Sequence, residues 1–136
     1  MDRSKNCQLH VTLEYPSGFS FAVVDSTYHG FALLEKGVTG DFISTYFFSS
    51  DADNTCSTRS TIQGGGIWAE GQVYTQRDSI PAADVLRSPC DGRSAQLNIN
   101  NRVSLRSSDS RAAGMISNDD QTLALTQQLH IDWFEC

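Results

Sequence analysis

Four cysteines are the residues of this 136-residue chain best suited to covalent or metal chemistry. They are far apart, with neither a C-x-x-C pair nor a neighbouring histidine: Cys7, Cys56, Cys90 and Cys136. A zinc site usually takes closely spaced ligand pairs, so we expect no metal. An even number of cysteines in a small, lysine-poor chain is typical of secreted proteins. The cysteines therefore predict two disulfides, with all three connectivities open, and a secreted, extracellular protein.

The histidines and carboxylates do not form a catalytic set in the sequence. Nucleophilic catalysis needs a serine or cysteine beside a histidine and a carboxylate, and the chain has no G-x-S-x-G motif. Glycoside hydrolysis needs paired acids, whereas Glu14, Glu35, Glu70 and Asp78 lie on separate segments. His29, in "YHG", is the most interesting histidine because it lies where a turn is expected. We predict no catalytic residues, and a hydrolase with an unrecognised cleft is the weakest alternative.

Two acidic loops and a run of glycines could in principle hold ions. The loops are "DADN" at 51–54 and "NDD" at 118–120. Calcium takes six to eight oxygen ligands, and neither loop has the full EF-hand pattern, so we predict solvated turns without metal or cofactor. The glycines at 64–66 lack the lysine of a phosphate-binding loop. They predict a close backbone approach or a mobile loop.

Two aromatic residues follow the glycines and could form an exposed binding platform. Aromatic rings stack on sugars and fill the pockets of partner proteins. Trp68 and Tyr74, together with His29, therefore form the candidate binding surface. The alternative is that both rings belong to the core or edge of a sheet. Trp133, beside the C-terminal cysteine, is expected in the core.

The charge of the chain excludes two classes of partner. The net charge is −6, and the ten basic residues are scattered, with only Arg102, Arg106 and Arg111 near one another. A nucleic-acid groove needs clustered lysine and arginine, so we expect no nucleic-acid partner. We also expect no membrane partner, because no apolar run approaches the roughly 18 residues of a spanning helix.

The apolar residues alternate with polar ones along nearly the whole chain, as in half-buried strands. In "QLHVTLE", Leu9, Val11 and Leu13 alternate with polar residues, and Leu97 and Ile99 do the same later. Short runs of this kind, separated by turn residues, predict an all-β, antiparallel sandwich or flattened barrel of about eight or nine strands. The Asn100–Asn101 pair predicts a bend or bulge. We expect one domain, 1–136, either monomeric or a homodimer paired through strands.

Several phrases in a fixed order resemble a known family. They are "CQL" at 7–9, "YPSGF" at 15–19, "YHGFALLEKGV" at 28–38, "SPC" at 88–90, "LNIN" at 97–100 and "WFEC" at 133–136. This pattern resembles the small, mostly fungal, secreted proteins known as domain of unknown function 4360. The resemblance covers most of the chain. It implies secretion and an all-β fold, and it carries over no catalytic residues.

The sequence departs from that family pattern in two places. Members usually have a further N-terminal segment with a "GCP.GS"-like motif before the "CQL" strand, and they tend to have Gly-Pro where this chain has "GGG" at 64–66. If the N-terminal cysteine of the family has a partner, Cys56 takes its place here. The resemblance therefore does not decide the disulfide pairing.

Together these observations favour a secreted, disulfide-stabilised and non-enzymatic binding protein. The first hypothesis is a fungal effector of the virulence type, whose partner is a host extracellular (apoplastic) protein. The alternative is a carbohydrate-binding module for cell-wall polysaccharide, which would use Trp68 and Tyr74. Cys90 lies in a Pro–Gly turn ahead of an alternating strand, so we interpret it as a staple of the sheet rather than a reactive thiol.

Overall fold

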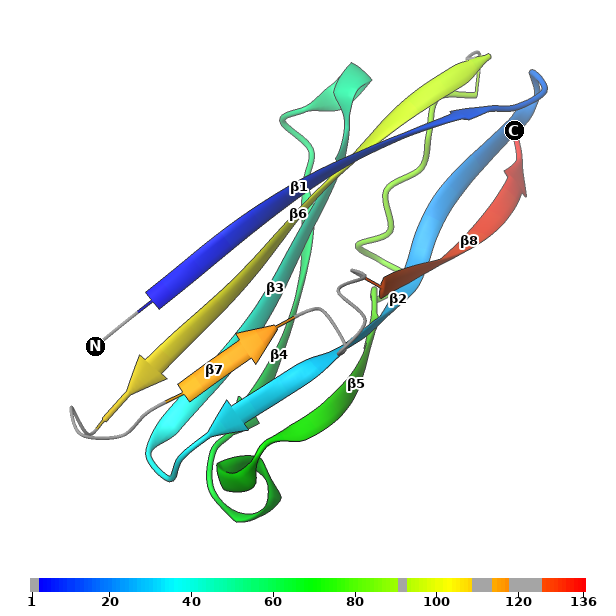
Figure 1. Cartoon of the computed structure of the whole chain (residues 1–136). Helices are drawn as coiled ribbons and strands as arrows, with labels where there is room; N and C mark the ends of the chain where they lie inside the picture. The colour runs from blue at the N-terminus through cyan, green and yellow to red at the C-terminus, as the bar shows by residue number, and fades with distance from the viewer. Residues whose placement is uncertain (1–2, 91–92, 109–113, 118–125) are drawn as a thin grey trace.

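The structure is a computed structural model that describes residues 3–90, 93–108, 114–117 and 126–136. Two antiparallel sheets pack face to face, as Figure 1 shows, and the described residues contain no α-helix. Sheet A has the strand order β1 (Arg3–Glu14), β6 (Ser94–Ser107), β3 (Val38–Phe48) and β4 (Cys56–Gln63). In sheet B, β2 (Phe19–Leu34) pairs with β5 (Gln72–Ser79) on one side, and with β7 (Gly114–Ser117) and β8 (Thr126–Glu135) on the other. The predicted all-β sandwich is confirmed.

The eight strands of the described residues fall within the predicted number, and β2 is the longest of them at 16 residues. A register shift relative to β8 lies between Val23 and Asp25. Such a shift adds one residue to the strand, so that Phe21 and Val23 before it and Ser26 and Tyr28 after it are all buried.

The bend predicted at Asn100–Asn101 is wrong. β6 keeps one unbroken register with β1 and with β3 through both asparagines. The reason is that the two residues obey the alternation of a strand. Asn101 is buried beside Ser44, whereas Asn100 lies on the opposite side of the sheet.

The interior contains two apolar clusters, each with residues from both sheets. One is built around Phe21, Phe48 and Ile99, and the other around Leu34, Phe42 and Tyr74. Four hydroxyl side chains lie between β2 and β3 where the clusters meet, and we call them the hydroxyl cluster: Ser26, Tyr28, Ser44 and Tyr46.

The hydroxyl cluster joins the two sheets by hydrogen bonds. The Ser26 hydroxyl lies 2.9 Å from that of Tyr46 and 3.0 Å from that of Tyr28, which also contacts Ser44. Ser44 donates to Asn101 Oδ1 at 2.8 Å, and Asn101 Nδ2 donates to Gln127 Oε1 at 2.7 Å. Burial raises the pKa of Tyr46 far above its usual value. The Tyr46 hydroxyl is therefore neutral across the physiological range.

One disulfide joins Cys90 to Cys136, with 5.9 Å between the Cα atoms. The Gly18 turn lies against this bond, because Gly18 N–H donates to Cys90 O and Cys136 N–H donates to Gly18 O. The Tyr15 hydroxyl also donates to Pro89 O at 2.7 Å. The interpretation of Cys90 as a staple is confirmed: it ties the segment before β6 to the end of β8.

The prediction that all four cysteines form disulfides is wrong, because Cys7 and Cys56 are free thiols. Cys7 lies on β1 and Cys56 on β4, at opposite edges of sheet A. Three strand spacings amount to about 14 Å. A disulfide spans at most about 7 Å between Cα atoms. The fold therefore keeps these two thiols apart.

We expect the unreduced protein to contain two titratable thiols of different reactivity. Cys7 is exposed and reacts with a thiol reagent in the native state, whereas Cys56 is buried and reacts only after denaturation. Burial also raises the pKa of Cys56, which lowers its thiolate fraction. A titration with Ellman's reagent, with and without denaturant, measures both. The absence of any thiol in the denatured, unreduced protein would contradict the assignment.

Removing one hydroxyl from the cluster should destabilise the sandwich. Tyr46→Phe leaves Ser26 and Tyr28 each without one buried partner, and we expect the free energy of unfolding to fall by about 1–3 kcal/mol. Thr45→Ala is the matched control, because it removes an exposed hydroxyl bond to Ser57. Urea unfolding measures both variants. Equal stability of Tyr46→Phe and the wild type would show that the cluster does not hold the sheets together.

Candidate binding face

The binding surface predicted from Trp68, Tyr74 and His29 does not form. Tyr74 is only 2% exposed, and its ring lies 5.0 Å from that of Phe42 in the core. It lies opposite Gly30 of β2, which has no side chain to occupy the same space. Trp68 is half-buried against the same apolar cluster. The alternative interpretation is correct for Tyr74, a core residue of β5, whereas Trp68 lies in the 3-10 helix Gly66–Glu70 and packs against the core from outside the sheet.

His29 and Trp133 also differ from their expected positions. His29 lies within β2 rather than at a turn, and it faces the solvent side of sheet B, where its Nδ1 lies 3.1 Å from Thr75 Oγ1. Trp133 is 53% exposed, although its ring lies 5.7 Å from that of Phe21. Because β8 is an edge strand, the core covers only part of this indole.

The solvent-facing side of sheet A is an extended polar surface that the strand register defines. It consists of the even-numbered residues of β1 and β6 and the odd-numbered residues of β3 and β4, and we call it the outer face. The opposite parity on β3 and β6 supplies Phe42, Leu97 and Ile99 to the core. The outer face is therefore a direct consequence of strand alternation.

Amide and hydroxyl side chains make up most of the outer face. Two amides are paired across β1 and β6, where Gln8 is opposite Asn100. A third amide, that of Asn6, is opposite Arg102. Its large apolar side chains, Ile43 and Phe47, are half-buried. The exposed large hydrophobic side chains of the described residues are Phe19, Ile67, Val73 and Trp133, and none of these is on the outer face. The surface therefore offers many hydrogen-bonding groups and little apolar area.

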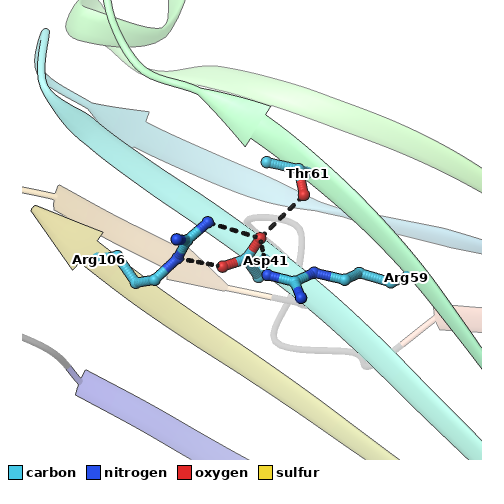
Figure 2. A network of polar contacts seen from close by, with 4 residues as sticks. All are labelled: Asp41, Arg59, Thr61 and Arg106. Atoms are coloured by element: carbon cyan, nitrogen blue, oxygen red, sulfur yellow. Dashed lines mark hydrogen bonds and ion pairs between the residues drawn. The ribbon is translucent and has the colours of Figure 1, made fainter.

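Asp41 is the centre of an ion-pair network on this face, shown in Figure 2. Arg106 Nε donates to Asp41 Oδ2 at 2.7 Å, Arg59 Nη2 lies 3.1 Å from Oδ1, and the Thr61 hydroxyl donates to Oδ1 at 2.9 Å. Asp41 is 2% exposed, whereas both arginine side chains are more than half exposed. Burial by itself would raise the pKa of Asp41, but the donors from β4 and β6 outweigh burial and lower that pKa.

The network fixes two guanidinium groups at the surface. A guanidinium has five N–H donors, and Asp41 uses only some of those on Arg59 and Arg106. Both side chains are more than half exposed. One buried carboxylate thus holds two cationic groups at the surface without neutralising both of them.

A cavity of about 550 Å³ continues the outer face beyond the network. Arg106, Thr39 and Gln63 of the outer face line it, together with Lys36 and Gly64. A Cβ at Gly64 would lie 2.1 Å from Glu35 O. The close backbone approach predicted for the glycines is therefore confirmed, and it brings the end of β4 against the β2–β3 turn at this cavity.

The sequence reasoning missed Asp41, Arg59 and Arg106. One signal was present: Arg102 and Arg106 lie four residues apart in one alternating strand and so share a face. Arg111, the third member of that group, lies outside the described residues.

The structure describes only one of the two acidic loops. Residues 51–54 are exposed, and the loop 118–120 lies outside the described residues. Within the described part of the chain, no three histidine, cysteine or acidic side chains cluster closely enough to hold a metal ion. The same part contains no helix long and apolar enough to span a membrane.

Comparison with known proteins identifies a family model, a curated relative and solved structures, of which TmCBM61 is one. The family model described as "Domain of unknown function (DUF4360)" matches residues 1–136. An "Uncharacterized secreted protein" of Arthroderma benhamiae is 38% identical over 135 residues, which cover 99% of this chain and 53% of the relative. The chain thus spans about half the length of that relative, whose name agrees with the predicted secretion. TmCBM61, solved in complex with β-1,4-galactotriose, is 17% identical with a TM-score of 0.35, over 97% of this chain and 64% of its own.

Two carboxylates with a lowered pKa should make the free energy of unfolding depend on pH. Burial alone would raise the pKa values of Asp41 and Asp25, but hydrogen bonds and positive charge from their arginine partners outweigh it and lower both pKa values below the usual range. The unfolded state therefore takes up protons on these carboxylates first as the pH falls. Their contribution is complete well above about pH 4 and is lost below it. We expect the free energy of unfolding, measured with urea from pH 7 to pH 2, to fall steeply below about pH 4.

Asp41→Asn tests how much the Asp41 network contributes to the free energy of unfolding and to its pH dependence. The variant removes the charge that Arg59 and Arg106 approach, so it should lower the free energy of unfolding at pH 7 by about 1–3 kcal/mol. It should also flatten the acid dependence. A variant with the wild-type acid slope would contradict the role of Asp41.

Proposed function

The chain belongs to the family described as Domain of unknown function (DUF4360), and we propose that it is a secreted, non-enzymatic protein that binds an extracellular polysaccharide through the outer face of sheet A. The observation that carries this proposal is the composition of the outer face. It presents amides, hydroxyls and guanidinium groups on four adjacent strands, beside a cavity lined by polar side chains.

A polysaccharide fits these groups because it presents a hydroxyl or ring oxygen at nearly every position. Amide side chains both donate and accept hydrogen bonds, so they can pair with a hydroxyl in either sense. The strands of the outer face are also held rigidly by their unbroken register. A rigid surface loses little conformational entropy when it binds, and this favours binding to an extended ligand.

The outer face suits a protein partner less well. The residues that dominate protein–protein affinity are aromatic and apolar anchors at a desolvated centre, together with arginine. Here Ile43 and Phe47 are half-buried and leave little apolar area to desolvate. Hydrogen bonds and charge must supply most of the affinity.

The contacts of the histidines favour a binding function over a catalytic one. In the described residues, His10 contacts Asn98, His29 contacts Thr75, and His130 contacts Asp25 and Asp132. No serine or cysteine nucleophile is among these partners. The arrangement offers ligand contacts rather than a charge relay to a nucleophile.

Binding to a host extracellular protein, as expected of an effector, is the second candidate, and a different surface favours it. Phe19 and Trp133 are 38% and 53% exposed on the same side of sheet B. Exposed tryptophan is enriched among the residues that dominate protein–protein affinity. Trp133→Ala should then abolish recovery of one defined protein from host extracellular fluid, while polysaccharide binding is retained.

The primary proposal is tested by affinity electrophoresis on a panel of soluble neutral and acidic polysaccharides. Ser104 lies across from Asp41 in the middle of the outer face. Ser104→Gln places a longer, uncharged side chain there, and we expect about tenfold weaker binding, or about 1.4 kcal/mol. The matched control is Thr27→Gln, which places the same side chain on the solvent side of sheet B.

Equal weakening by the two variants would contradict the proposed surface. Failure of the wild type to bind any polysaccharide of the panel would contradict the proposed function itself. Thermal unfolding of both variants must match that of the wild type, since a folding defect would weaken binding for another reason.

A further inference from the structure

The charge of the outer face is opposite to that of the protein as a whole. The chain carries a net charge of −6. On the outer face, the described residues place Arg59, Arg102 and Arg106 around Asp41, and the other carboxylate, Glu14, lies at the far end of β1. An acidic protein has therefore gathered arginines from two strands, β4 and β6, at one end of one sheet. This arrangement raises the local concentration of anions.

The arginines are spaced along and across the sheet. Arg59 and Arg102 are both directly opposite Ile43, one on each side of β3. Two strand spacings separate them, or about 10 Å. Arg106 lies four residues beyond Arg102 on β6, or about 13 Å along the strand. The three guanidinium groups thus cover an area that matches several repeats of a polymer rather than one small anion.

Asp41 neutralises only part of this charge. It pairs with Arg59 and Arg106, which together carry two positive charges against one negative charge. Arg102 is exposed, and its neighbours across the strands, Ile43 and Asn6, are uncharged. In the described part of the chain, Asp25 pairs with Arg77 and Asp41 pairs with Arg59 and Arg106, and neither carboxylate pairs with Arg102.

The cavity at the end of the outer face adds a fourth cation. Lys36 and Arg106 line it together with the hydroxyl and amide groups of Thr39 and Gln63. Its volume of about 550 Å³ lies within the range of small-molecule sites. The combination of two cations with neutral polar groups suits a ring that carries hydroxyls and one carboxylate.

We propose that the polysaccharide bound by the outer face is acidic, with carboxylates of uronic acid residues recognised by Arg102, Arg106 and Lys36. This inference rests on the proposed function. Arginine forms short, charge-assisted and often bidentate hydrogen bonds to carboxylates. The outer face lacks an exposed aromatic ring on which a neutral sugar could stack, so charge supplies the affinity that stacking would otherwise provide.

Isothermal titration against polygalacturonate and alginate, with galactan and a soluble β-glucan as neutral polymers, tests the inference. We expect the acidic polymers to bind more tightly and to lose affinity as salt rises. Arg102→Gln and Lys36→Gln should each weaken that binding by about fivefold, because each removes one cation that Asp41 does not hold. Neither change disturbs the Asp41 network, so both variants should fold.

Arg93→Gln is the matched control, since it removes the same charge from an exposed residue at the other end of β6, about 30 Å from Arg102. If Arg93→Gln weakened binding to the acidic polymers as much as Arg102→Gln does, the loss of affinity would follow from net charge alone, and the inference would be overturned. The inference would also be overturned if galactan or β-glucan bound more tightly than the acidic polymers, with an affinity unchanged in Arg102→Gln but weakened in Ser104→Gln. That result would leave the proposed function intact. Binding to none of the four polymers would count against the proposed function as well.

Discussion

The register of β6 is the constraint on which the rest of the structure depends. This strand pairs without interruption with β1 on one side and β3 on the other. Leu97 and Ile99 must face the core, so Asn98, Asn100 and Arg102 must lie on the opposite side of the sheet. A slip of one residue would exchange the two sets and place the Arg102 guanidinium at the position of Val103, opposite Phe42 in the core. The burial of apolar side chains therefore determines the outer face, although no residue of that face belongs to the core.

Two further interactions hold the second sheet in its place. The hydroxyl cluster requires Ser26 and Tyr28 of sheet B to meet Ser44 and Tyr46 of sheet A, because a buried hydroxyl without a partner is costly. The Cys90–Cys136 bond fixes the end of β8 beside the Gly18 turn. Neither interaction reaches the outer face. The outer face contributes to stability separately, through the Asp41 network.

Alternation along each strand was readable from the sequence, but contacts between strands were not. Period-two patterns predicted an all-β sandwich and the shared face of Leu97 and Ile99, because side-chain direction within a strand depends only on neighbouring residues. The order of the strands is a property of the whole chain. Without it, Cys7 and Cys56 could not be placed at opposite edges, nor could Arg59 be placed across β3 from Arg102. The burial of Tyr74 could not be predicted in the same way, because Tyr74 lies opposite Gly30, a residue of another strand.

The account is tested most directly by mapping a bound acidic oligosaccharide onto the backbone amides by nuclear magnetic resonance. A titration of the ¹⁵N-labelled protein with oligogalacturonate should shift amides of β3, β4 and β6 around Asp41, together with those of the cavity near Lys36 and Gly64. Amides near Phe19 and Trp133 should stay unchanged. Shifts confined to the Phe19–Trp133 end, or to the solvent side of sheet B, would contradict the outer face as the binding surface.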